Sequence, residues 1–179
     1  MNPVDIFELI VNEHYVPLFK FAMSLTRDET DAWDLVQQTF YIWAAKGYQL
    51  RDVTKVKTWL FTTLHRSFLK GRRRQSNFPT SDIAEEELSA PAPELVDPAE
   101  VSKVLTALAK VDEIFQAPLA LFYLEDCSYK DIAAILQVPV GTVKSRIARG
   151  IAQLRKSLLQ EDPDAFAPEA RAPCLHTWA

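Results

Sequence analysis

The chain has 179 residues, of which 48% are hydrophobic and only 4 are glycine, which favours one or two small helical domains with apolar cores. Its two cysteines, Cys127 and Cys174, argue against a disulfide-stabilised secreted protein. The sequence begins without a basic signal-peptide region and holds no apolar run of the roughly 18 residues that a membrane span needs, so we expect a soluble, cytoplasmic protein without membrane insertion.

Charge is distributed unevenly along the chain, although the net charge is only −4. Residues 1–78 and 101–160 each carry a net charge of +3, whereas residues 79–100 carry seven acids and no base. This acidic stretch holds four prolines and few large apolar residues, so it cannot bury enough surface to offset its ordering entropy. The predicted units are two domains at 1–77 and 101–160, a flexible acidic linker at 78–100 and a disordered tail at 161–179.

Helical periodicity dominates both predicted domains. Asn2 is expected to cap the first helix, with Pro3 in its favoured first position, and Pro17 should kink or divide this helix. Every predicted element is helical, so the fold class is all-α, with two small helical domains. Four further helices are predicted at about 30–46, 54–73, 98–110 and 113–125, before the two helices of residues 128–149.

Residues 128–149, SYKDIAAILQVPVGTVKSRIAR, predict a helix-turn-helix in the second domain. Ser128 and Asp131 match a capping box for a short helix, Pro139 lies in the break, and Thr142 is expected to cap the longer helix. In this motif the second helix enters the major groove with its N-terminal residues at base edges. An ordinary amphipathic hairpin with a solvated basic face is the alternative. The residues expected to contact duplex DNA are Thr142, Lys144, Ser145, Arg146 and Arg149.

A strongly basic stretch precedes the linker. Residues 51–74 hold eight Lys and Arg and one Asp, a net charge of +7, interleaved with Trp59, Phe61, His65 and Phe68. Basic side chains that follow phosphates and aromatic side chains that stack on bases suit single-stranded nucleic acid. The alternative is that the individual aromatic residues belong to the core beneath a solvated basic face, and we favour that alternative for them.

Three segments together resemble the extracytoplasmic-function (ECF) sigma factors of the sigma-70 family, over nearly the whole chain up to about Gln160. DAWDLVQQTF is similar to the family's core-binding segment, and KTWLFTTLHRSFLKGRRR is similar to its promoter-melting helix. YLEDCSYKDIAAILQVPVGTVKSRIARGIAQL is similar to its reader of the −35 element, and PVGTVKSR is the most specific run. In this chain Arg66 and Lys70 stand where the family often has Asn and Asp, and Gln116 stands where it often has Arg.

The resemblance implies a transcription initiation factor that binds core RNA polymerase and directs it to promoter DNA, both duplex and single-stranded. Asp34, Gln37 and Gln38 would contact the clamp helices of the largest polymerase subunit, and residues 47–53 would hold a flipped base. The residues implied for the −10 element are Lys55, Lys57, Thr58, Trp59, Thr62, Arg66, Arg72, Arg73 and Arg74. The −35 residues are those of the helix-turn-helix given above.

Further partners follow from the resemblance alone. The linker would thread the polymerase's active-site and RNA-exit channel, where its acidic charge suits a basic surface. The polymerase flap is a second expected contact, and an anti-sigma protein is the expected inhibitor.

Two other classes of function compete with this interpretation. A stand-alone regulator would bind a duplex operator through the same helix-turn-helix and would not need polymerase. An enzyme is the weaker alternative, because His14, His65 and His176 are scattered and His14 lies on an apolar helix face. Cys174 and His176 fall short of the four ligands of a structural zinc site. We therefore expect no catalysis, no cofactor and no metal.

Overall fold

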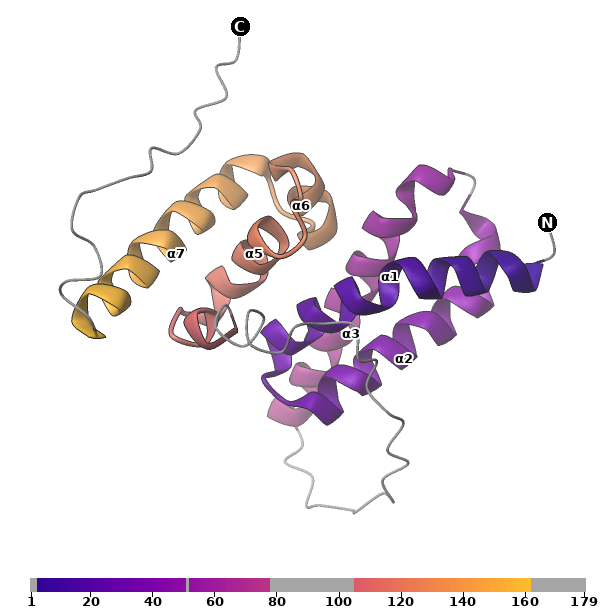
Figure 1. Cartoon of the computed structure of the whole chain (residues 1–179), viewed down its shortest axis with the longest axis horizontal. Coiled ribbons are helices and arrows are strands. Elements are labelled where there is room, and N and C mark those ends of the chain that lie inside the picture. The colour runs from indigo at the N-terminus through magenta and orange to yellow at the C-terminus, as the bar shows by residue number, and fades with distance from the viewer. Residues whose placement is uncertain (1–2, 51, 78–104, 162–179) are drawn as a thin grey trace, which may run out of the picture.

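The computed structural model describes residues 3–50, 52–77 and 105–161, and these residues are helical apart from turns (Figure 1). This confirms the all-α fold class. The predicted linker at 78–100 lies outside the described residues, as does the predicted tail apart from Glu161, which ends the last helix. The elements of the first domain are α1 (Pro3–Thr26), α2 (Glu29–Lys46), the 3-10 turns η1 (Gly47–Gln49) and η2 (Val53–Lys55), and α3 (Val56–Asn77). Those of the second are a helical turn at 105–109, α5 (Glu113–Tyr123), α6 (Tyr129–Leu136) and α7 (Val140–Glu161).

Pro17 does not divide the first helix, contrary to one of the two outcomes predicted for it. The residue lies inside α1, which continues to Thr26. Leu18, Phe21 and Ala22, just beyond the proline, are fully buried. Packing of an apolar face supplies most of the stability of a helix in a protein, so burial offsets the backbone hydrogen bond that proline lacks.

A tight turn joins α1 to α2. Arg27 adopts a left-handed conformation with φ of 61°, and its backbone N–H donates to the Met23 carbonyl at 3.0 Å, which ends α1. The Asp28 carboxylate then accepts a hydrogen bond from the Asp31 N–H at 2.9 Å and caps α2. This turn fixes where the acidic start of α2 stands.

The core of the first domain lies between α1, α2 and α3. Phe21 of α1 and Phe61 of α3 are fully buried, with ring centroids 5.4 Å apart, and Val36 of α2 packs with them. His14 is also buried, as its place on the apolar face predicts, and burial lowers the pKa of His14 below its usual value. The core therefore holds α3 in a fixed orientation, so that the face opposite Phe61 is turned outward.

The helix-turn-helix forms largely as predicted. The Ser128 hydroxyl accepts the Asp131 N–H, and the Asp131 carboxylate in turn accepts the Ser128 N–H, so the predicted capping box is confirmed. Gln137 ends α6 in a left-handed conformation with φ of 56°. The prediction that Thr142 caps the next helix is wrong, because α7 begins at Val140 and the Thr142 N–H already donates to the Pro139 carbonyl at 2.9 Å.

Replacing Ser128 with alanine is expected to destabilise the second domain by about 1 kcal/mol, the usual cost of losing a side-chain cap. The hydroxyl satisfies a backbone donor at the start of α6, and α6 carries the buried Ile132 of the helix-turn-helix. Urea unfolding followed by circular dichroism measures the change. Ser128→Thr keeps the hydroxyl and should retain most of the stability, whereas equal losses in both variants would contradict the capping role.

The two domains pack against each other. Helix α5 of the second domain lies against α1, and α6 lies against α3, close to where the two halves of the molecule meet in Figure 1. Within the second domain, α7 crosses α5 closely at Gly150, where a β-carbon would stand 2.6 Å from a Leu119 methyl group. The sequence gives no direct signal of the contact between the domains.

Candidate nucleic-acid interface

Helix α3 carries most of the side chains predicted to contact the −10 element. Phe61 is fully buried, so the core alternative is confirmed for this aromatic residue. Trp59 is only partly buried and packs edge-on against Trp43, with centroids 5.1 Å apart. The hydroxyl of Thr62 donates to the Thr58 carbonyl at 2.7 Å, which leaves its lone pairs available as acceptors. The predicted side chains that are exposed on this part of the chain are Lys55, Arg66, Arg72, Arg73 and Arg74.

A basic hollow of about 520 Å³ lies between the end of α2 and α3. Three cationic side chains line it, and Trp59 forms part of its wall. Sequence reasoning did not include Lys46 or Lys70 among the binding residues, although Lys70 follows Arg66 by four positions and so shares its helix face. The cations that line the hollow are Lys46, Arg66 and Lys70.

The loop between α2 and α3 borders this hollow. Gly47 begins it, and a β-carbon there would stand 2.6 Å from the Trp43 ring, so only glycine fits against the indole. Tyr48 and Val53 extend from the loop with 81% and 79% of their surface exposed. Gln49 and Leu50 of the loop line the basic hollow, whereas Tyr48 and Val53 line a separate, largely apolar hollow. The exposed Tyr48 ring is a surface on which a nucleobase can stack.

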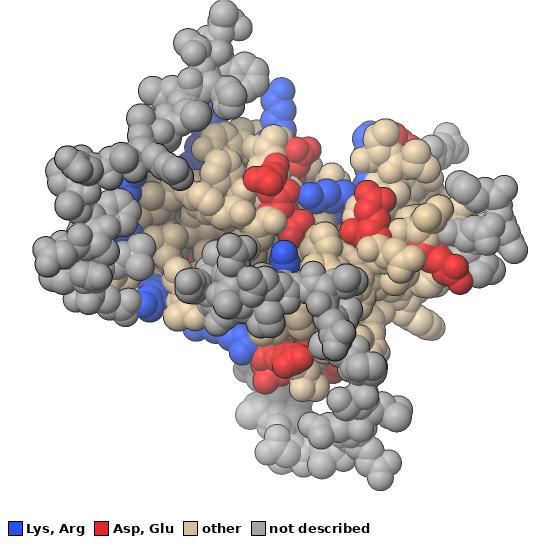
Figure 2. All heavy atoms as spheres, in the orientation of Figure 1, with Lys and Arg blue, Asp and Glu red and all other residues tan. Residues whose placement is uncertain are grey.

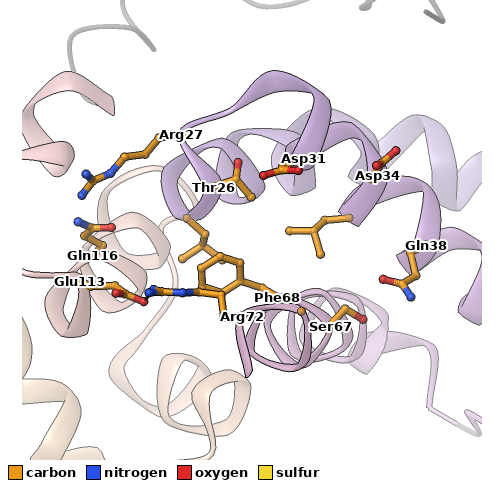
Figure 3. Close-up of a pocket in the computed structure, with 13 residues that line it drawn as sticks. Thr26, Arg27, Asp31, Asp34, Gln38, Ser67, Phe68, Arg72, Glu113 and Gln116 are labelled. Atoms are coloured by element: carbon orange, nitrogen blue, oxygen red, sulfur yellow. Dashed lines mark ion pairs between the residues drawn. The ribbon is translucent and has the colours of Figure 1, made fainter. Parts of the chain in front are cut away.

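Three cations of α3 are in contact with the second domain. The Lys57 ammonium donates to the Glu125 carbonyl at 2.9 Å and lies 3.6 Å from its carboxylate. The Arg66 Nε donates to the Gln137 side-chain oxygen at 3.4 Å. Arg72 forms an ion pair with Glu113 of α5, and the two side chains meet end to end in Figure 3. Sequence reasoning found the cations but not their partners, which lie between 41 and 71 residues away.

The first turns of α7 present the predicted −35 residues in two environments. Val143 and Ile147 are buried, so this side of the helix faces the core of the second domain. Lys144, Ser145 and Arg149 are exposed on the other side, and the Ser145 hydroxyl donates to the Thr142 carbonyl at 3.0 Å. Thr142 and Arg146 are half-buried.

Arg146 differs from its neighbours because it faces the first domain. It lines a hollow of about 480 Å³ together with His65 of α3 and Leu136 of α6. Burial, with a smaller contribution from the Arg146 charge, lowers the pKa of His65 to about 4. His65 is therefore neutral near pH 7 and can lie beside a guanidinium without charge repulsion.

The predicted polymerase-binding residues lie on an exposed face of α2. Asp34, Gln37 and Gln38 are all exposed, and Asp34 and Gln38 line a hollow of about 460 Å³ (Figure 3). Asp31 lies one helical turn before Asp34, and burial together with the neighbouring carboxylates raises the pKa of Asp31. The start of α2 is acidic, although Arg27 and Arg72 also line this hollow, whereas the hollow lined by Lys46, Arg66 and Lys70 has no acidic residue among the described residues around it.

Figure 2 shows how the charged side chains are distributed on one face of the molecule. On the face drawn in Figure 2, basic and acidic side chains lie interspersed among neutral ones. Among the described residues, no group of three or more His, Cys, Asp and Glu is placed to hold a metal ion. In that same part of the chain, no helix is long and apolar enough to cross a membrane.

Comparison with known families decides which class of protein this is. Residues 10–78 match the family described as Sigma-70 region 2, and residues 102–154 match the family described as Sigma-70, region 4. The chain belongs to the sigma-70 family of sigma factors. The curated relatives described next, both named ECF RNA polymerase sigma factors, place it among the ECF sigma factors.

Similar sigma factors come from two other bacteria. The chain is 30% identical over 161 residues to the ECF RNA polymerase sigma factor SigE of Mycolicibacterium smegmatis, covering 87% of this chain and 62% of SigE. It is 27% identical over 158 residues to the ECF RNA polymerase sigma factor SigM of Bacillus subtilis, covering 84% of this chain and 91% of SigM.

Two solved structures share the fold. A sigma factor RpoE, solved in complex with the anti-sigma factor NepR from Bartonella quintana, matches with a TM-score of 0.68 and 29% identity, over 87% of this chain and 98% of RpoE. CnrH, solved in complex with the cytosolic domain of CnrY, matches with a TM-score of 0.62 and 26% identity, over 87% of this chain and 88% of CnrH. Both alignments are long enough to span both domains.

The two sigma regions divide the functional residues of this sigma factor. The predicted polymerase-binding and −10 residues fall within the region 2 match, and the predicted −35 residues fall within the region 4 match. Gln116, where the family often has Arg, is buried in region 4 and donates to the Val111 carbonyl at 2.7 Å. This departure therefore belongs to the packing of the second domain.

Proposed function

We propose that this sigma factor binds core RNA polymerase through α2, engages the −10 element with α3 and the loop before it, and reads the −35 element with α7. The observation that carries the proposal is the presence of region 2 and region 4 matches in one chain, in that order. A stand-alone operator-binding regulator is not favoured, because it has no use for a region 2 domain. The nucleotidyl transfer would belong to the polymerase, so we assign this protein no catalytic role and a cytoplasmic location.

The charge and shape of the first domain support the −10 assignment. The basic hollow lined by Lys46, Arg66 and Lys70 can attract a phosphate backbone, and Trp59 forms part of its wall. Tyr48 belongs to the loop whose Gln49 and Leu50 line this hollow, and its exposed ring is one on which a flipped base could stack. The loop at 47–53 would thus bind the flipped base by stacking, and the cations would bind the phosphates of the same DNA strand.

The acidic face of α2 supports the polymerase assignment. Asp34, Gln37 and Gln38 are exposed and free of the core, so they can meet a basic or polar surface of a partner. The clamp helices of the largest polymerase subunit are the partner that we assign to this face, and the flap is the partner that we assign to the second domain.

The exposed cations of α7 give the −35 assignment a direct test. Lys144→Ala and Arg149→Ala should each weaken promoter binding by the holoenzyme, and a base-specific contact predicts a loss of about 1–3 kcal/mol confined to one −35 base pair. Arg155→Ala is the matched control, because it removes the same charge from an exposed position farther along α7. Competition binding against −35 sequences with single base changes measures the effect. A loss of equal size on every sequence would contradict base reading and assign the side chain to phosphates.

We also propose that an anti-sigma protein inhibits this sigma factor. One of the solved structures described above is a complex of the sigma factor RpoE with the anti-sigma factor NepR. Affinity purification of the chain from its host under non-inducing conditions should recover a protein that blocks binding to core polymerase. Recovery of polymerase alone, with no inhibitor encoded beside the gene, would contradict this part.

A further inference from the structure

The hollow between the end of α2 and α3 gathers positive charge without matching negative charge. Lys46 of α2 and Arg66 and Lys70 of α3 line it, and all three side chains are exposed. None of the described residues that line the hollow is acidic. Arg66 and Lys70 stand four positions apart on one helix face, where like charges repel and weaken the helix. Helix α3 therefore carries a pair of charges that no carboxylate of the hollow balances.

We propose that Lys46, Arg66 and Lys70 form a phosphate clamp, which holds the backbone of one DNA strand at the −10 element and contributes affinity that does not depend on base sequence. This inference rests on the proposed function of α3, and it adds a ligand class for the hollow and two binding residues, Lys46 and Lys70. Arg66 and Lys70 stand where the family often has Asn and Asp, neither of which carries a positive charge. The clamp is therefore not expected in relatives that keep Asn and Asp at these positions.

The donors of the hollow suit phosphates better than base edges. Phosphate oxygens only accept hydrogen bonds, whereas base edges present donors as well as acceptors. Ammonium and guanidinium groups are donors that cannot accept. The hydroxyl of Thr63, a further lining residue, donates to the Trp59 carbonyl at 2.8 Å, so its proton is already used within α3. The three cations therefore fit a ligand that offers only acceptors and negative charge.

The walls of the hollow suit a nucleic-acid strand better than a small anion. Ile42, Leu50 and Trp59 contribute apolar surface beside the cations. A strand presents sugars and base faces next to its phosphates, and proteins that bind single strands combine a positive groove with aromatic side chains. The cations also come from two helices, so a strand lying in the hollow would pass between Lys46 on one side and the cations of α3 on the other.

The contacts that these cations already make leave them able to bind such a strand. The Arg66 Nε donates to the Gln137 side-chain oxygen at 3.4 Å, which is longer than the usual range, and the guanidinium carries four further N–H groups. Lys46 lies in the last turn of α2, where the helix dipole favours a cation. That position accounts for a cation at the end of α2, but not for two more across the hollow.

A triple substitution with a matched control tests the clamp in the holoenzyme. Fluorescence anisotropy, over a range of salt concentrations, measures binding of a labelled single-stranded oligonucleotide that carries only the −10 region of a promoter which the holoenzyme opens. The hollow variant combines Lys46→Gln, Arg66→Gln and Lys70→Gln. The control variant neutralises two Lys and one Arg that are exposed on the second domain, by Lys130→Gln, Arg155→Gln and Lys156→Gln.

The hollow variant should bind the oligonucleotide with a weaker dependence on salt than the wild type and the control. The slope of log K against log salt should become shallower by about 2, because each phosphate contact to a single strand contributes about 0.7. The loss of affinity should be equal on an oligonucleotide of scrambled sequence. Neutral methylphosphonates, scanned one at a time along the strand, should weaken the wild type at the contacted positions and leave the hollow variant unaffected there, since both changes remove the same contact.

An unchanged slope, or a loss confined to one base sequence, would overturn the clamp. A free polyphosphate anion offers the same chemistry as the strand. Inorganic triphosphate at constant ionic strength should therefore displace the oligonucleotide poorly, and displacement at micromolar concentrations from the wild type alone would overturn the assignment to DNA. Thermal unfolding should occur at the same temperature in the hollow variant or slightly higher, because repulsion between Arg66 and Lys70 is relieved. A large decrease would instead assign the cations a structural role.

The same preparations separate this inference from the proposed function. A wild-type holoenzyme that opens the promoter, together with an unchanged salt slope in the hollow variant, would refute the clamp alone. A wild-type chain that does not assemble with core polymerase would refute the proposed function.

Discussion

Phe61→Ala is expected to lower the free energy of unfolding of the first domain by about 3–5 kcal/mol. The Phe61 ring is fully buried between α1 and α3 and packs against Phe21 at 5.4 Å between centroids. Truncation removes these contacts and leaves a cavity in a core built from only three helices. Urea unfolding monitored by circular dichroism and tryptophan fluorescence measures the loss.

The same substitution should also disturb the DNA-binding face, because Phe61 lies on α3 between Lys57 and Arg66. Phe61→Leu is the matched control, since it keeps an apolar side chain in the site and should lose much less stability. A loss below about 1 kcal/mol for Phe61→Ala would contradict the burial of this residue and would reopen its interpretation as a base-stacking ring.

Asp34→Lys is expected to reduce the affinity for core RNA polymerase by about 30-fold, which corresponds to about 2 kcal/mol. Asp34 is exposed on α2 beside Gln38, at the acidic rim of the hollow in Figure 3. A lysine there would replace an attractive contact with a basic partner by a repulsive one. Titration of labelled core polymerase with the sigma factor measures the affinity.

Glu13→Lys is the matched control for this change, because Glu13 is an exposed carboxylate on α1 and the substitution alters the net charge equally. Both variants should bind duplex promoter DNA with equal affinity in the absence of polymerase. Equal polymerase affinities in the two variants would show that the acidic face of α2 is not the contact.

Local patterns in the sequence predict the elements of this fold well where local physics decides them. Ser128 and Asp131 stand three residues apart, and the capping box forms as that spacing requires. Gln137 and Pro139 end α6 at the predicted break. The prediction fails at the start of α7: Thr142 has the residue type of a cap, but the chain turns at Pro139 and the helix begins two residues before Thr142.

Tertiary effects are what the sequence does not reveal. Pro17 stays inside α1 because the residues after it are buried against other helices, and no local rule reports that burial. Lys57, Arg66 and Arg72 are recognisable as a basic face, but their partners in the second domain are distant in sequence and carry no motif. Arg146 lies near the start of the second helix of the helix-turn-helix, where an exposed DNA-contacting residue is expected, yet it faces the first domain. The sequence therefore predicts which side chains form the candidate site. It does not predict that several of them contact the second domain.

Permanganate footprinting of promoter DNA, with core RNA polymerase present and absent, tests the central claim most directly. With the sigma factor and core polymerase together, thymines near the −10 position should become reactive, and they should stay unreactive with either protein alone. Tight binding of this protein to duplex DNA without core polymerase, with no reactive thymines when core is added, would contradict the account.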